Sequence, residues 1–181
     1  MSIFGVDRVG RASDGKFCTR TLERGDVNPN SPDINGRTPL SLAAWRGQEG
    51  PVKTLLERGD VDPNSPDSNG RTPLSRAGAE REREGVVKLL LQHRDISPDL
   101  SDNSGLTPLS FAASRGYEGV VKLFLERRDV NPNSSDRNGQ TPLIYAAISR
   151  AAGVVQQLLK RADVKATLSD KWWPNTSVNC C

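Results

Sequence analysis

The stretch NGRTPLSLAAWRG, residues 35–47, decides how the chain is organised, because most of it recurs three more times. The copies are NGRTPLSRAG from residue 69, NSGLTPLSFAASRG from residue 103 and NGQTPLIYAA from residue 138. Their threonines, at positions 38, 72, 107 and 141, follow one another at intervals of 34, 35 and 34 residues. An aspartate recurs with the same period at positions 33, 67, 102, 136 and 170. A fixed period of this size predicts a solenoid built from one small supersecondary unit.

Each repeat begins with a tight turn and a strong helix-start signal. The turn has the pattern Asp-x-Asn-Gly at 33–36, 67–70 and 136–139, and Asn and Gly tolerate the positive φ of a hairpin tip. The stretch at 102–105 reads DNSG and keeps only the glycine in register. Thr-Pro-Leu follows, in which Thr caps a helix and Pro occupies a first helical position that needs no NH.

Two helices of unequal character are expected in each repeat. The first is short, and Leu40, Ala43 and Ala44 form one buried face whose alanines let a neighbouring helix come close. The second is far more apolar, as in GPVKTLLERG and GVVKLLLQHR, and ends where Asp-Val-x-Pro-Asn stops it. Helices of about ten residues are marginal alone, so the stacked array should unfold as one cooperative body.

These patterns carry a family resemblance. The pattern D-x-x-G-x-T-P-L-x-x-A-A, a glycine turn and then V-V-K-x-L-L resemble the ankyrin repeat, whose period is about 33 residues. The loop RGDVNPNSPD together with NGRTPLS is similar to the ankyrin arrays that are abundant in filamentous fungi. The resemblance implies an all-α ankyrin-repeat solenoid, made of helix-turn-helix units joined by β-hairpin-like loops.

The resemblance divides the chain into consecutive segments. The segment 1–16 matches no repeat and is expected to be disordered, and 17–32 is a degenerate half-repeat because TLERGDVNPNSPD copies LLERGDVDPNSPD of 55–67. The whole repeats are repeat 1 (33–66), repeat 2 (67–101), repeat 3 (102–135) and repeat 4 (136–169), before a tail at 170–181. Trp172 and Trp173 of the tail either fold over repeat 4 or stay exposed. The half-repeat also fits a chain that is a fragment of a longer array.

Three departures from the ankyrin pattern raise structural questions. The family commonly has TPLH, whereas repeats 1 to 3 have serine in place of the histidine and repeat 4 has Ile144. Serine can bond nearby backbone, and isoleucine cannot. Repeat 2 is one residue longer and lacks the turn glycine found as Gly47 and Gly116, so its turn should be irregular. Repeat 4 has Arg150 in place of this turn glycine and is expected to be a degenerate last repeat.

The inventory of reactive groups argues against an enzyme. The one histidine, His93, stands where other repeats have arginine, which indicates a basic residue at the surface near a helix end. Neither a Cys/His pair, a GxSxG elbow, a P-loop nor a GxGxxG turn opening a helix is present. Equivalent carboxylates of successive repeats should lie about a repeat width apart and should therefore not form a pair. The sequence therefore predicts a non-catalytic protein with no cofactor and no metal.

Composition narrows the class of partner and the location. The net charge of +3 is mild and the charges alternate in sign, which does not favour a nucleic-acid site. There is no apolar run of membrane-spanning length, and no membrane contact is expected. MSIFGVDRVGRASDG lacks the apolar core of a secretory signal, so the expected location is the cytoplasm or the nucleus. The three cysteines, Cys18, Cys180 and Cys181, fit incidental thiols. The expected state is a monomer.

Positions that vary within the constant scaffold are the candidates for function. In each first helix the residues opposite the buried face, such as Trp45 and Arg46, are available for contacts outside the core. The resemblance to ankyrin proteins implies that these residues and the variable hairpin positions line a concave groove that binds a partner protein. The predicted partner-binding residues are Ile34, Arg37, Trp45, Arg46, Ser68, Arg71, Asn103, Leu106, Phe111, Ser114, Arg115, Arg137, Gln140, Tyr145 and Ile148.

The mixture of aromatic residues and arginines suggests the chemistry of the partner. Trp, Tyr and Arg often dominate interface energies, and the clustered arginines suggest an acidic partner surface. Two alternatives stay open: Phe111 and Tyr145 could instead fill space between neighbouring first helices, and the arginines could serve solubility. The sequence therefore predicts a protein-protein interaction module or scaffold. The alternative is a structural spacer, or a fragment of a longer multidomain ankyrin-array protein.

Overall fold

The computed structural model describes residues 28–81 and 83–165, in which eight helices and no strand are found. The first helices of the repeats are α2 (Pro39–Arg46), α4 (Pro73–Gly78), α6 (Pro108–Arg115) and α8 (Pro142–Ile148). The second helices are α3 (Glu49–Leu56), α5 (Glu84–Gln92), α7 (Glu118–Leu125) and α9 (Ala152–Lys160). The expected all-α solenoid is confirmed. The segments 1–16 and 170–181, with Trp172 and Trp173, lie outside the described residues, as does most of 17–32.

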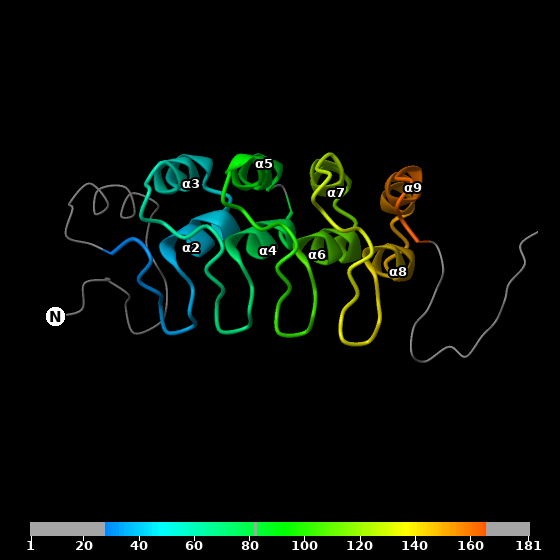
Figure 1. Ribbon diagram of the computed structural model, residues 1–181, viewed down its shortest axis with the longest axis horizontal. Coiled ribbons are helices and arrows are strands. Elements are labelled where there is room, and N and C mark those ends of the chain that lie inside the picture. Colours follow the sequence, from blue (N-terminus) through cyan, green and yellow to red (C-terminus); the bar gives the residue numbers. More distant parts are fainter. Residues whose placement is uncertain (1–27, 82, 166–181) are drawn as a thin grey trace, which may run out of the picture.

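The helices form two parallel layers, with the hairpins extending from the first-helix layer on the side away from the second helices (Figure 1). Each first helix contacts the first helix of the next repeat, and each second helix contacts the next second helix. No helix of the described part is long and apolar enough to cross a bilayer.

The core runs between the two layers as one continuous cluster. The predicted face of the first helix is buried, with Leu40 and Ala44 fully covered and Ala43 nearly so. From the second helices Val52, Leu55 and their counterparts in the other repeats enter the same cluster. Burying this surface removes apolar area from water, which is the main stabilising contribution available to such short helices.

Every first helix begins with the same cap. The Thr38 side chain accepts a hydrogen bond from the Ser41 amide at 3.2 Å, and the threonines of repeats 2, 3 and 4 make the equivalent bond. None of the serines at the TPLH position bonds backbone through its hydroxyl in the described part of the chain, and the buried Ser41 hydroxyl has no hydrogen-bond partner there. The Ser75 and Ser110 hydroxyls lie 3.1 and 3.0 Å from the Oγ1 atoms of Thr72 and Thr107, so they bond a side chain and not the backbone.

The first helices end in different ways in the regular and the irregular repeats. In repeats 1 and 3 the helix ends at Gly47 and Gly116, both left-handed with φ of 71°. In repeat 2 the helix has only 6 residues and its cap, Ala79, stays right-handed, so the irregular turn predicted there is confirmed. In repeat 4 Arg150 adopts the left-handed conformation, with φ of 58°.

Candidate partner-binding face

Three backbone and side-chain ladders hold successive repeats in register and so fix the face that carries the predicted site. At the hairpin tips the Ser68 amide donates to the Asn35 carbonyl at 3.0 Å, and the Asn103 backbone amide donates to the Asn69 carbonyl at 2.9 Å. In the loops after the second helices, Asn64 Nδ2 donates to the Asp95 carbonyl at 2.7 Å. The third ladder uses arginines near the ends of the second helices and is described below.

The hairpins are built around their repeated aspartates. Oδ1 of Asp102 accepts from the amides of Ser104 and Leu106 at 2.8 and 3.0 Å, and Asp33, Asp67 and Asp136 use Oδ1 in the same way. Their second oxygen takes a different donor in each repeat. Three of the four donors are predicted partner-binding residues, so these residues contribute to the fold as well.

Arg37, Arg71 and Tyr145 supply three of those donors. Arg37 Nε and Nη2 lie 2.8 and 2.6 Å from Asp33 Oδ2. The Tyr145 hydroxyl donates to Asp136 Oδ2 at 2.7 Å, and burial together with this bond raises the pKa of Tyr145 to about 12. The Arg71 Nε lies 3.5 Å from Asp102 Oδ2. These side chains are therefore held in place before any partner arrives.

Phe111 belongs to the packing. Its side chain is only 8% exposed, and the guanidinium of Arg71 lies 4.8 Å from its ring centroid. The alternative in which Phe111 fills space between neighbouring first helices therefore fits better than direct contact with a partner. Ser114, beside it, donates its hydroxyl to the Phe111 carbonyl at 2.8 Å. Leu106 and Gln140 are half-buried on the hairpins.

The remaining predicted residues are accessible. Ile34 and Ile148 are 99% and 64% exposed, and Trp45 is 38% exposed while its Nε1 donates to Glu80 Oε1 at 3.1 Å. The other accessible members are Arg46, Ser68, Asn103, Arg115 and Arg137. A tryptophan oriented by the hydrogen bond that it donates to the next repeat is a preorganised apolar surface, which lowers the entropy cost of binding.

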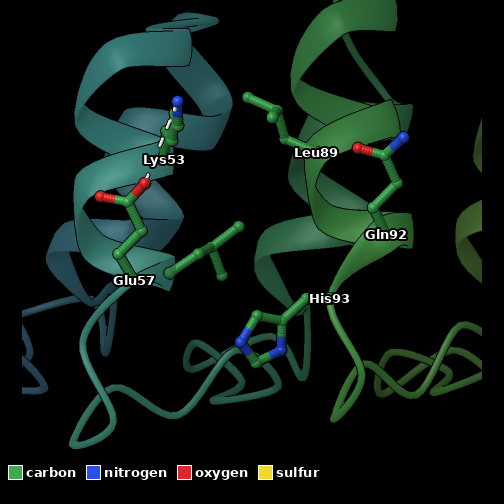
Figure 2. Close-up of a pocket in the computed structure, with 6 residues that line it drawn as sticks. Lys53, Glu57, Leu89, Gln92 and His93 are labelled. Atoms are coloured by element: carbon green, nitrogen blue, oxygen red, sulfur yellow. Dashed lines mark ion pairs between the residues drawn. The ribbon is translucent and has the colours of Figure 1, made fainter.

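The sequence did not point to every feature of the surface. Arg76, the counterpart of Phe111 and Tyr145 in repeat 2, was not among the predicted partner-binding residues; it pairs with the buried Asp67 and completes the aspartate series. Two exposed leucines, Leu100 and Leu159, were also not predicted, because period alone does not distinguish them from core residues. Leu56 and Leu89 line a shallow depression between α3 and α5 (Figure 2).

Reactive groups do not converge within the described ranges. No set of three His, Cys, Asp or Glu side chains there could hold a metal ion. His93 is half-buried at the C-terminal cap of α5, so its prediction as a residue near a helix end is confirmed. Glu49, Glu84 and Glu118 each lie close to a glycine of the next second helix.

Comparison with known proteins agrees with the geometry. A family model described as ankyrin repeats (3 copies) matches residues 11–102 and 79–167, which together cover most of the chain. A search of curated proteins gave no match. Ankyrin repeats are typically non-catalytic. The chain therefore belongs to the ankyrin-repeat family, whose repeats generally act as protein-protein interaction modules.

Proposed function

We propose that this chain is a non-catalytic protein-binding module that holds its partner on the face formed by the hairpin tips and the first helices. The observation that carries the proposal is Trp45, a partly exposed indole held by Glu80 next to the exposed Arg46. Tryptophan and arginine are the residue types most often found at the energetic centre of protein interfaces.

An acidic partner surface follows from the charges that remain available. Arg37 and Arg71 are engaged with Asp33 and Asp102, whereas Arg46, Arg115 and Arg137 are exposed. The exposed arginines can pair with carboxylates of a partner, and such charges act mainly on association rate and specificity. Binding through them should weaken as salt concentration rises.

The experiment is an affinity capture with the wild-type chain, Trp45→Ala and Arg115→Glu, followed by a binding titration with any protein retained. We expect each variant to weaken binding by at least about tenfold, which corresponds to about 1.4 kcal/mol. Arg71→Glu is a poor test, because it would place a second carboxylate beside Asp102.

The matched control is Lys122→Glu, which reverses an exposed charge in the same repeat on the second helix α7. Circular dichroism melting confirms that all variants are folded. Unchanged binding by both face variants, or equal loss in Lys122→Glu, would count against this face as the site.

A further inference from the structure

The arginines near the ends of α7 and α9 connect their repeats to the preceding ones. Arg127 Nε and Nη2 pair with Asp129 at 2.8 and 2.5 Å, while Nη1 donates to the Leu91 carbonyl of repeat 2. Arg161 pairs with Asp163 in the same way and donates to the carbonyls of Arg127 and Val130 at 3.1 and 2.7 Å. Arg127 thus reaches a carbonyl at the end of α5, whereas Arg161 reaches carbonyls in the loop that follows α7.

The junction between repeats 1 and 2 lacks this guanidinium. The equivalent residue is His93, whose Nδ1 only accepts a hydrogen bond at 3.3 Å from the Asp95 amide within its own loop. At this junction a shallow depression of about 190 Å³ lies between α3 and α5, lined by Lys53, Leu56, Glu57, Leu89, Gln92 and His93 (Figure 2). Leu56 is the counterpart of Leu91, whose carbonyl receives Arg127 in the next junction.

The lining of the depression suits an arginine side chain. Leu56 and Leu89 are half-buried and offer apolar contact to the methylene stem. Glu57 carries an exposed carboxylate, engaged by Lys53 only at 4.0 Å with both side chains about two-thirds exposed. Such an exposed pair is weak, and the C-terminal end of α3 adds partial negative charge for a planar guanidinium.

We infer that the depression between α3 and α5 is a binding site for an arginine side chain presented by a partner protein. The partner arginine would take the place that Arg127 occupies at the junction between repeats 2 and 3. The site lies on the second-helix layer, so a protein bound there would leave the hairpin face available for the partner proposed above.

The test is an NMR titration of the full chain with N-acetyl-arginine amide as the probe. The chain contains one histidine, so the imidazole signal of His93 is a unique reporter, supported by the Leu56 and Glu57 amides. We expect saturable shifts with this probe and much smaller ones with the uncharged, nearly isosteric N-acetyl-citrulline amide. Methylguanidine should bind more weakly than the capped arginine, because it lacks the stem that contacts the leucines.

Two substitutions test the origin of the site. His93→Arg should supply the guanidinium from the chain itself and remove the saturable shifts of the Leu56 and Glu57 amides. Arg127→His should open an equivalent site, so that the Leu91 amide begins to respond. Absence of saturable shifts in the wild type, equal shifts with the citrulline probe, or an unchanged response in a folded His93→Arg variant would overturn the inference.

Discussion

At the scale of single residues, Asp99 interrupts a ladder that asparagines maintain elsewhere. Asn64 and Asn133 each donate through Nδ2 to a backbone carbonyl of the next repeat at 2.7 Å and accept an amide through Oδ1. Asp99 makes only the second of these two hydrogen bonds, because its Oδ2 accepts from the Asn131 amide at 2.8 Å but the side chain has no group that donates. Its buried Oδ1 has no hydrogen-bond partner among the described residues. A carboxylate here lacks the donor that the ladder requires.

Asp99→Asn should therefore stabilise the protein. Restoring the missing donor and removing an unsatisfied buried acceptor is expected to raise the free energy of unfolding by about 1–3 kcal/mol. Urea denaturation at neutral pH measures the change. Asp62→Asn, at an exposed loop position in repeat 1, is the control and should have little effect. Equal stability of Asp99→Asn and wild type would show that Oδ1 finds a partner in solution.

The gain from Asp99→Asn should depend on pH. Burial, with a further contribution from the Asp129 charge, raises the pKa of Asp99, although the Asn131 amide and the charges of Arg161 and Arg127 act to lower it. Protonated Asp99 is thus favoured by folding. This contribution is complete below the ordinary pKa of 3.8 and is lost as pH rises through the raised value.

The difference in unfolding free energy between Asp99→Asn and wild type should accordingly be smallest in acid and grow toward neutral pH. Denaturation of both chains over this range provides the measurement. Other carboxylates, such as Asp60, whose pKa is lowered by its hydrogen bond to Arg58, titrate in both proteins and largely cancel in the difference. A difference that widens on acidification would contradict the assignment.

Arg150 is a second residue that is poorly suited to its position, because it has a backbone conformation that favours glycine. It is left-handed, and its amide and that of Ala151 close the same cap that Gly47 and Gly116 close in repeats 1 and 3. The left-handed conformation costs a residue with a Cβ about 1–2 kcal/mol. Arg150→Gly should recover about 1 kcal/mol of stability in thermal or urea unfolding. Arg150→Ala keeps the Cβ and should bring no comparable gain; if it does, the side chain and not the backbone is responsible.

At the scale of elements, each first helix depends on its N-terminal threonine. Thr107 caps α6 through the Ser110 amide at 3.2 Å, and its hydroxyl also lies 3.0 Å from the Ser110 hydroxyl. Thr107→Ala should lower the free energy of unfolding by about 1–2 kcal/mol, because a buried amide and a buried hydroxyl lose their partner. Thr107→Ser keeps the oxygen and should retain most of the stability. Similar losses in both variants would point to the methyl group instead.

At the scale of the whole molecule, stability comes from contacts between neighbouring repeats. Phe124 of α7 is fully buried, and its ring lies close to Gly78 of α4 in the preceding repeat. Phe124→Ala should cost about 3–5 kcal/mol through lost burial and the cavity that it leaves. If the array is one cooperative body, hydrogen exchange in α2 and α8 should rise together in this variant. Protection that persists in α2 while α8 exchanges freely would show that the array unfolds in parts.

The candidate site was less predictable than the repeats. Helical period placed Trp45 and Arg46 on the outside, and both are exposed. The same period placed Phe111 there as well, yet it is buried and lies beneath Arg71. Whether an outward position is covered depends on which side chain the neighbouring repeat brings to it, and one repeat read alone does not contain that information.

The sequence by itself determined the period, the helix starts at Thr-Pro-Leu, the hairpin turns and the buried face of each first helix, because these follow from caps, φ preferences and helical spacing within a few residues. Only the tertiary structure decided what happens between repeats. It brought Trp45 to Glu80, left Oδ1 of Asp99 without a hydrogen-bond partner among the described residues and formed the depression beside His93. These features join residues about a repeat length or more apart, and their energies depend on distances that stacking alone sets.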